Sequence, residues 1–193
     1  MAAGPEKVPL LIIEGNIGVG KSTLLRKMRD SDPLAGTEHC YIEEEIGPVL
    51  LQEFYDGKIE KHAFQMAVLT DRFKKLVEAY TKGYKKIVID RYIYGDLAFA
   101  MSNIRTPKEY AMYFSLWKTC KQHLERCFDI TCIFLQGVST NFLLGNIKRR
   151  GRESETSITA EYLEDIEIRT YQCVMTFCTG EVVFAVPELT PPE

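Results

Sequence analysis

The chain has 193 residues, of which 46% are hydrophobic, and its formal net charge is −3 at pH 7. Domains commonly contain about 100–200 residues, so we expect a single domain over residues 1–193, and the slightly negative charge gives no reason to expect nucleic-acid binding. No apolar run approaches the roughly 20 residues that cross a bilayer, so no membrane partner is expected. The six cysteines form no C-x-x-C pair, and the N-terminus shows no signal-peptide pattern. These features predict a cytoplasmic protein.

The first predicted element is an apolar strand at residues 10–14, which runs directly into G-x-x-x-x-G-K-S and then into a predicted helix at 23–28. In this motif the glycines let backbone N–H groups turn toward phosphate oxygens at the positive end of the helix. The lysine reaches the β- and γ-phosphates, and the serine hydroxyl ligates Mg²⁺. The residues of the predicted phosphate-binding loop, which would bind ATP, are Gly15, Asn16, Ile17, Gly18, Val19, Gly20, Lys21, Ser22 and Thr23.

Four further strands are predicted at residues 40–42, 86–90, 130–136 and 182–186, with helical stretches between them. One helix is expected to begin with a capping box at Thr106 and Glu109, with Pro107 in its first turn. Nearly continuous apolar runs are typical of strands buried on both faces of a parallel sheet. We therefore predict an α/β fold, a three-layer sandwich with a doubly wound, parallel, five-stranded sheet and helices on both faces.

Carboxylates follow the second strand at Glu43, Glu44 and Glu45, where they would face the crevice beside the phosphate loop. A kinase that acts on an alcohol needs such a group to accept the hydroxyl proton, which contributes about 10²–10⁴ in rate. The third strand ends in Asp90 and Arg91. We expect Asp90 to hold Mg²⁺ together with the serine of the loop, and Arg91 to stabilise the charge that develops during phosphoryl transfer.

An arginine-rich segment at about 149–158 is predicted to be a lid that closes on the triphosphate. Its candidate phosphate-binding residues are Arg150 and Arg152. In other phosphoryl-transfer enzymes, an arginine that stabilises the transition state raises turnover by about 10³–10⁵. A new helix is expected from about Thr159.

Together these segments resemble the deoxynucleoside kinases, a family of P-loop kinases, over about residues 9–189. The resemblance implies that Glu44 is the catalytic base and that Lys21 and Arg91 are catalytic as well. It also implies transfer of phosphate from ATP, with Mg²⁺, to the 5′-hydroxyl of a 2′-deoxynucleoside in nucleotide salvage. A homodimer is implied too.

The resemblance further implies a nucleoside site. Tyr55 and Glu155 would hold the sugar 3′-hydroxyl, and Gln65, beside Phe64, would bind the base edge. Near the base the family also has an arginine, an acid and a stacking ring, which correspond to Arg72, Asp96 and Phe99.

The chain departs from the family pattern at several positions. The proline after the catalytic glutamate is Glu45, and a serine after the third-strand arginine is Tyr92. An arginine of the lid helix is replaced by Asn146, for which Lys148 or Arg149 could substitute. These departures affect base preference and the lid rather than the reaction.

Two alternative functions share parts of this pattern. The D-R-Y sequence ending at Tyr92 also resembles thymidylate kinases, but a carboxylate about 4 Å from an acceptor phosphate is unfavourable by several kcal/mol, so the acidic triplet favours a nucleoside. An ATP-hydrolysing switch or motor would have no use for a sugar and base pocket. Base preference stays open, because Gln65 can pair with thymine or cytosine by turning its amide. The pair of Arg72 and Asp96 favours deoxycytidine or purines, and a multisubstrate enzyme is equally compatible.

Overall fold

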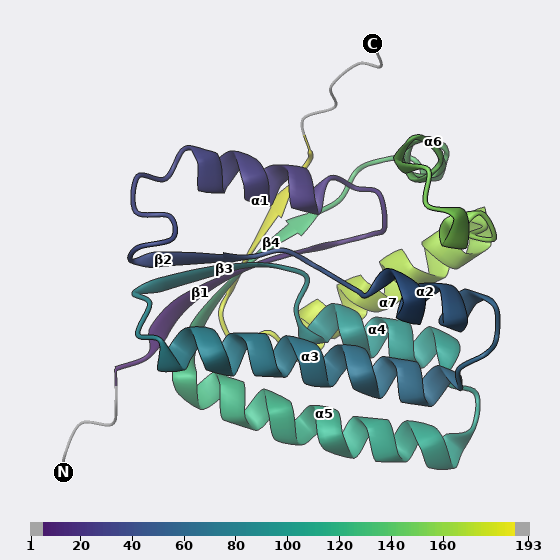
Figure 1. Ribbon diagram of the computed structural model, residues 1–193, viewed down its shortest axis with the longest axis horizontal. Helices are drawn as coiled ribbons and strands as arrows, with labels where there is room; N and C mark the ends of the chain where they lie inside the picture. The colour runs from purple at the N-terminus through teal and green to yellow at the C-terminus, as the bar shows by residue number, and fades with distance from the viewer. Residues whose placement is uncertain (1–5, 188–193) are drawn as a thin grey trace.

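The computed structural model describes residues 6–187 and contains one parallel sheet with the strand order β2-β3-β1-β4-β5 (Figure 1). All four pairings between neighbouring strands are parallel, which confirms the predicted doubly wound sheet. The central strand β1 has β3 on one side and β4 on the other, so the chain changes direction across it. Ligand sites of such sheets lie at the carboxyl ends of the strands at this point. The strands are β1 (Val8–Gly15), β2 (His39–Ile42), β3 (Lys86–Asp90), β4 (Phe128–Leu135) and β5 (Glu181–Ala185).

Each predicted strand is present, although β1 and β4 begin two residues earlier than the apolar runs suggest, because Val8 pairs with Phe128 at the start of both strands. The described helices include a single 3₁₀ turn, η1. Their bounds are α1 (Lys21–Asp30), α2 (Pro48–Tyr55), α3 (Lys61–Thr81), α4 (Ile93–Asn103), α5 (Pro107–Cys127), α6 (Thr140–Arg150), η1 (Glu153–Glu155) and α7 (Ala160–Phe177).

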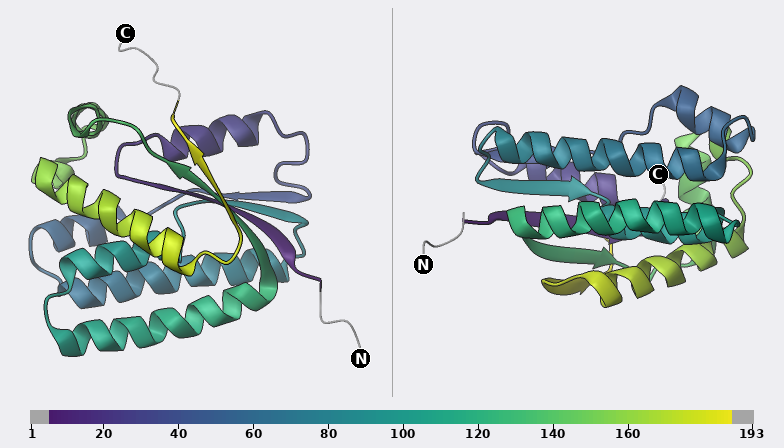
Figure 2. Two further views of the ribbon diagram at one scale, coloured as in Figure 1. Left: turned by 180° about the vertical axis from the view of Figure 1, so that it is seen from behind. Right: turned by 90° about the horizontal axis from the view of Figure 1, so that it is seen from below.

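The helices cover both faces of the sheet (Figures 1 and 2). Successive side chains of a strand point to opposite faces, and in β1 Leu10 and Ile12 join a core that includes residues of α3, α4, α5 and α7. Ile13 points the other way, into a second core with α1 and α6. The predicted three-layer sandwich is therefore confirmed, and the phosphate loop emerges from between its layers.

The expected capping box at the start of α5 is wrong. Thr106 is the N-cap residue, but its side chain accepts no hydrogen bond from the helix. This first turn is exposed, so its free N–H groups can reach water instead. The expected helix after the lid begins at Ala160, and there Thr159 does cap, accepting a hydrogen bond from the Tyr162 backbone N–H.

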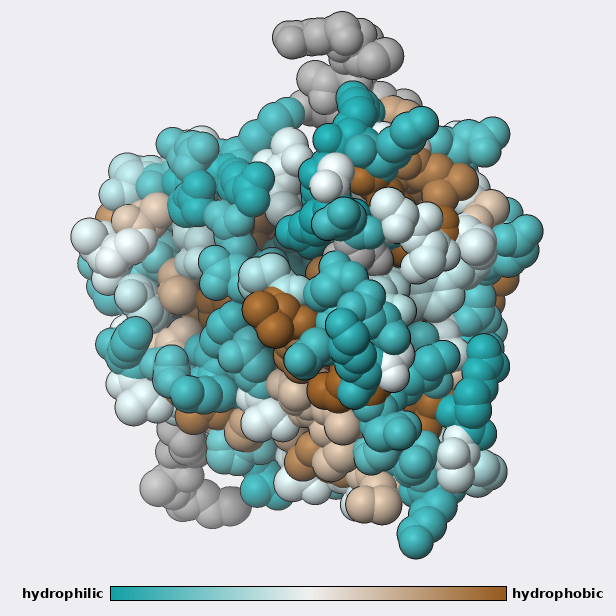
Figure 3. Space-filling model, turned by 45° about the vertical axis from the view of Figure 1, so that its right-hand side comes forward, coloured by the Kyte–Doolittle hydropathy of each residue, from teal (hydrophilic) through white to brown (hydrophobic). Residues whose placement is uncertain are grey.

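The face seen in Figure 3 is largely hydrophilic, with hydrophobic residues in small separate groups. Within residues 6–187, none of the helices combines the length and the apolar character that crossing a membrane requires. The expected domain of residues 1–193 also includes 1–5 and 188–193, which lie outside the described residues.

Candidate active site

A cavity of about 790 Å³ opens at the carboxyl ends of the central strands. It brings together the phosphate loop, the segment after β2, helices α2, α3 and α4, and the lid. Four predicted site residues do not line it: Gly15, Asn16, Arg72 and Asp90. The predicted residues that do line it are Ile17, Gly18, Val19, Gly20, Lys21, Ser22, Thr23, Glu44, Tyr55, Phe64, Gln65, Arg91, Asp96, Phe99, Arg150, Arg152 and Glu155.

The phosphate loop is packed tightly against its surroundings. Gly15 has φ 141°, and a Cβ atom there would lie 2.7 Å from the backbone oxygen of Leu135. Only glycine tolerates this combination. Beside it, the side chain of Asn16 donates to the backbone oxygen of Leu163 at 2.8 Å, which anchors the loop to α7. Gly15 and Asn16 thus shape the loop from behind.

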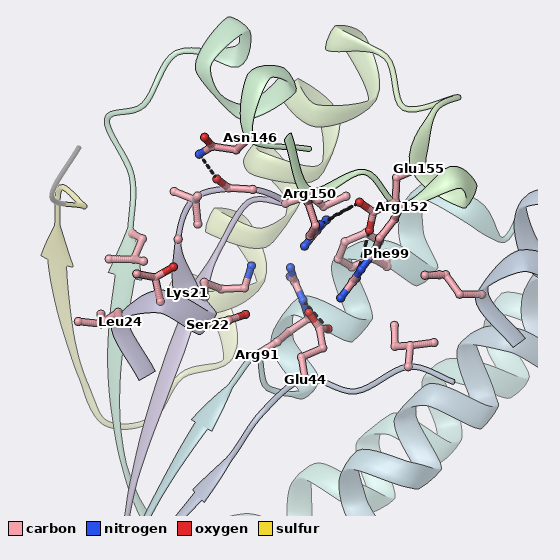
Figure 4. A pocket seen from close by; sticks show the side chains of 18 of the residues that line it. Lys21, Ser22, Leu24, Glu44, Arg91, Phe99, Asn146, Arg150, Arg152 and Glu155 are labelled. Atoms are coloured by element: carbon pink, nitrogen blue, oxygen red, sulfur yellow. Dashed lines mark hydrogen bonds and ion pairs between the residues drawn. The ribbon is translucent and has the colours of Figure 1, made fainter. Parts of the chain in front are cut away.

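Lys21 begins α1 and is buried, with its Nζ donating to the backbone oxygen of Asn16 at 2.8 Å. Burial, and then the neighbouring Arg91, lower the pKa of Lys21 to about 8. Figure 4 shows that the cationic ends of four side chains point into the same space: Lys21, Arg91, Arg150 and Arg152. Such a concentration of positive charge suits a triphosphate.

Ser22 and Asp90 meet as expected, and the serine hydroxyl donates to Asp90 Oδ2 at 2.5 Å. Asp90 Oδ1 is buried and has no hydrogen-bond partner among the described residues. A hydroxyl and a carboxylate with a free oxygen fit Mg²⁺, which takes one or two protein ligands and completes its shell with phosphate oxygens and water. Within residues 6–187, no group of three or more His, Cys, Asp or Glu side chains gathers as a metal cage.

Glu44 faces the cavity opposite Lys21 (Figure 4), and its side chain is 24% exposed. Arg91 Nε and Arg72 Nη2 both donate to its Oε1, at 2.9 and 3.1 Å. The other oxygen, Oε2, accepts no hydrogen bond from a described residue. Burial opposes the charged form, but Arg91, Arg72 and Lys21 outweigh it and lower the pKa of Glu44 to about 2. Glu44 is therefore a positioned carboxylate with one oxygen open to the cavity.

Arg91 follows β3 with φ 64°, an unusual conformation for a residue other than glycine. Its guanidinium carbon lies 4.8 Å from the centroid of the Phe99 ring, and its Nη1 lies 3.8 Å from Glu14 Oε2. Helix α4 passes so close that a Cβ atom on Gly95 would lie 2.9 Å from Arg91 Cγ. The strained backbone and these three neighbours orient the guanidinium group toward Glu44.

Arg72 lies behind the cavity wall and is almost fully buried. It binds Asp96 through Nε at 2.7 Å and Nη2 at 3.1 Å. Its Nη1 donates to the backbone oxygens of Asp90 and Arg91, and its Nη2 also donates to Glu44. These five hydrogen bonds use all five N–H groups of a guanidinium. Arg72 therefore holds other site residues in place and has no N–H left for a nucleobase.

The far end of the cavity is aromatic. The Phe54 and Phe64 rings stack with their centroids 4.1 Å apart, and Gln65, the next residue, is buried and lines the cavity. Burial raises the pKa of Tyr55, and the nearby Tyr162 and Glu155 add to this effect. Of the predicted sugar and base residues, all except Arg72 thus line the cavity.

The lid begins in the last turn of α6, whose last residue is Arg150 and whose C-cap residue is Gly151 with φ 66°. Glu155 is buried, and its Oε2 accepts hydrogen bonds from Arg150 at 2.6 and 3.1 Å, while its Oε1 accepts one from Arg152 at 3.3 Å. Figure 4 shows both interactions. In this state one carboxylate pairs with both predicted lid arginines.

Among the residues in or behind the cavity that were not predicted as site residues from the sequence are Asn103 and Tyr162, which line it, and Glu14, which does not. Asn103 donates to the Tyr162 hydroxyl at 3.2 Å, and both line the cavity. Nothing in the local sequence marks Asn103. Glu14 is fully buried, accepts backbone N–H groups of Tyr92 and Gly95 at 2.8 and 3.1 Å, and has a pKa raised by burial. The sequence feature that could have identified Glu14 is its position as a carboxylate at the end of an apolar strand.

Comparison with known proteins identifies a family and similar folds. A family model described as "Deoxynucleoside kinase" matches residues 11–185. Among solved structures, deoxyadenosine kinase from M. mycoides with bound dATP is 25% identical, with a TM-score of 0.71 over 95% of this chain and 93% of that chain. The same enzyme with bound dCTP gives 22% identity and a TM-score of 0.71, over 94% and 91%. A structure of this enzyme with the products dCMP and a flexible dCDP bound has 21% sequence identity and a TM-score of 0.70, over 94% of this chain and 92% of that chain. Among curated proteins no match is found.

Proposed function

The chain belongs to the deoxynucleoside kinase family and is a kinase that phosphorylates deoxynucleosides, and on that premise we propose that Glu44 is the general base that prepares the 5′-hydroxyl. The observation that carries this proposal is the position of the Glu44 carboxylate. It faces the phosphate loop across the cavity, and two arginines hold its Oε1 while Oε2 stays open. The reaction transfers the γ-phosphoryl group of ATP to the sugar hydroxyl and yields the monophosphate and ADP.

A pKa of about 2 keeps Glu44 ionised at neutral pH but makes it a weak base. This suits a loose transition state, in which the hydroxyl loses its proton only as the new P–O bond forms. The proton then passes to Oε2, while Arg91 and Arg72 keep their hydrogen bonds to Oε1. The two arginines thus fix the direction of the accepting oxygen throughout the step.

We assign the phosphate end of the cavity to ATP. Lys21 and Arg91 would bind the transferred group, and the lid arginines Arg150 and Arg152 would turn from Glu155 toward the triphosphate. Ser22 and Asp90 would hold Mg²⁺, which when bound offsets negative charge on the phosphates. The open Asp90 Oδ1 supports this assignment.

We assign the aromatic end to the deoxynucleoside. Tyr55 and Glu155 would bind the 3′-hydroxyl, and with the sugar bound their packing would leave little room for a 2′-hydroxyl. Gln65 would bind the base edge between the rings of Phe64 and Phe99. Asp96 would shape the base site through Arg72, because its two oxygens already bind that guanidinium group.

Gln65 can turn its amide to match cytosine or thymine, so we propose that deoxycytidine and thymidine are both substrates. The dATP-bound state of the M. mycoides enzyme supports including purine deoxynucleosides in the test. Turnover against all four deoxynucleosides decides the preference. We also propose a homodimer, by resemblance to the family, which sedimentation of the purified protein tests.

The substitution Glu44→Gln tests the assignment of the base. The amide keeps the shape of the side chain and an acceptor for Arg91 but cannot take the proton. We expect turnover to fall by at least about a hundredfold, while calorimetry shows near-normal binding of ATP and nucleoside.

The matched control is Glu45→Gln, which changes the neighbouring exposed carboxylate and is expected to leave turnover within about twofold. Near-normal turnover of the Glu44 variant would reject it as the base. Phosphate transfer to thymidylate in place of thymidine would reject the nucleoside assignment.

A further inference from the structure

The three arginines of the lid differ in what balances their charge. Arg150 and Arg152 both bind the carboxylate of Glu155. Arg149 instead donates through Nη2 to Oδ1 of Asn146, a neutral amide. Within residues 6–187, no carboxylate forms an ion pair with Arg149, so its positive charge differs from those of Arg150 and Arg152 in having only a neutral partner there.

Asn146 is in turn anchored on the phosphate loop. Its Nδ2 donates to the backbone oxygen of Gly18 at 2.7 Å (Figure 4). Helix α6 packs directly on the loop at this point, because a Cβ atom on Gly18 would lie 3.0 Å from the backbone oxygen of Leu143. The amide of Asn146 thus uses its donor on the loop and its acceptor on Arg149, which a carboxylate could not do.

We propose that Arg149 binds the phosphates of the donor nucleotide and that Asn146 is its positioning residue. Both side chains line the cavity beside the phosphate loop, and a guanidinium matches phosphate oxygens with two parallel hydrogen bonds. The proposal rests on the assignment of that end of the cavity to ATP, made above.

The difference in partners gives Arg149 a distinct role. To reach a phosphate, Arg150 and Arg152 must give up an ion pair with Glu155, whereas Arg149 gives up at most one hydrogen bond to an amide. Leaving a charged partner costs more than leaving a neutral one. Arg149 is therefore the lid cation that is available to the triphosphate before the lid rearranges.

The test is steady-state kinetics of Arg149→Ala, with Arg149→Gln as a second variant and Lys148→Ala as the matched control. Lys148 is the neighbouring cation on the same helix but is not among the described residues that line the cavity. We expect both Arg149 variants to raise KM for ATP about tenfold or more, as for lost hydrogen bonds to a charged group. KM for the nucleoside should stay within twofold, and Lys148→Ala should change neither value.

Asn146→Asp tests the positioning role. The carboxylate would neutralise Arg149 and lose the hydrogen bond to Gly18, so KM for ATP should rise about as much as in Arg149→Ala. Combining the two substitutions should add little, since both act through one guanidinium. Independent, additive effects would reject Asn146 as the positioning residue.

Equal KM values for ATP in Arg149→Ala and Lys148→Ala would overturn the proposal while leaving the kinase assignment intact. Failure of the assignment itself looks different, because the unsubstituted protein would then form no deoxynucleoside monophosphate. Arg149 is exposed, so its substitution leaves the core untouched, and thermal melting verifies that each variant folds.

Discussion

At the scale of single residues, the site combines buried charges of opposite sign. Lys21 is buried beside Arg91, and these two causes lower its pKa to about 8. Glu44, across the cavity, stays ionised because Arg91, Arg72 and Lys21 outweigh its burial. The Glu44 carboxylate is thus charged throughout the neutral pH range, whereas the Lys21 ammonium group loses its proton at a pH at which activity can be measured.

The lowered pKa of Lys21 predicts an alkaline limit to ATP use. Below pH 8 the ammonium group is charged and attracts the triphosphate; as the pH rises through about 8 it loses its proton and that attraction. We expect kcat/KM for ATP, which reports the free enzyme, to fall above this pH. Bound triphosphate stabilises the charged form, so kcat at saturating ATP should persist to higher pH.

The control for this profile is Lys21→Arg, whose guanidinium keeps its charge at every accessible pH. Its kcat/KM for ATP should lack the decline near pH 8, whatever its absolute activity. An unchanged alkaline limb in this variant would mean that another group titrates there.

At the scale of elements, the starts of two helices with similar sequences differ. Both α5 and α7 follow a threonine, but only Thr159 accepts a hydrogen bond from its helix, at 3.2 Å from the Tyr162 N–H, whereas Thr106 accepts none. Helix α7 directly follows the lid, so this cap fixes where the lid ends.

The comparison predicts different stabilities for two matched variants. Thr159→Ala should lower the free energy of unfolding by about 1 kcal/mol, the usual value of a side-chain cap. Thr106→Ala should change it by less than about 0.5 kcal/mol, as for an exposed position without such a bond. Urea denaturation measures both, and equal losses would contradict the assigned caps.

At the scale of the whole molecule, Arg72 joins four segments. From α3 it reaches Glu44 after β2, the backbone oxygens at the end of β3, and Asp96 in α4. These segments carry the residues that we propose as the base, as a metal ligand and as the phosphate-binding arginine. The site is therefore held together from behind by one side chain that faces no ligand.

Replacing Arg72 by Met should affect stability and catalysis in separate ways. Asp96 would be left buried without its partner, which typically costs about 3–5 kcal/mol. Adding Asp96→Leu removes that orphaned carboxyl, and we expect it to recover much of the stability in thermal or urea unfolding.

The double variant, Arg72→Met with Asp96→Leu, should not regain the pH dependence of kcat of the unsubstituted protein. Arg72 helps to lower the pKa of Glu44, so its loss raises that pKa. The proposed base works as the carboxylate, which is present above the pKa of Glu44 and becomes protonated as the pH falls through that pKa. The acid limb of kcat should therefore move to higher pH both in Arg72→Met and in Arg72→Met with Asp96→Leu. An acid limb at its original pH would show that Arg72 contributes only stability.

Much of this protein follows from sequence alone, because the signals are local. A strand, a glycine-rich loop and a helix lie next to one another in the chain, and apolar runs of four to eight residues reveal the strands of a parallel sheet whatever lies around them. The same local reasoning placed acids at the ends of β2 and β3, and the family resemblance supplied the nucleoside site.

Only the tertiary structure showed which partners neighbouring residues of the same type bind. Of the three glutamates after β2, Glu43 binds Arg26 and Arg29 of α1, while Glu44 turns to Arg91. The hydrogen bond from Asn146 to Gly18 joins residues 128 positions apart. Such contacts depend on how helices pack against the sheet, and no local pattern encodes them. The sequence alone therefore determined the fold and the chemistry at the strand ends, and the family resemblance singled out Glu44, whereas packing decided which partner each carboxylate and each lid arginine binds.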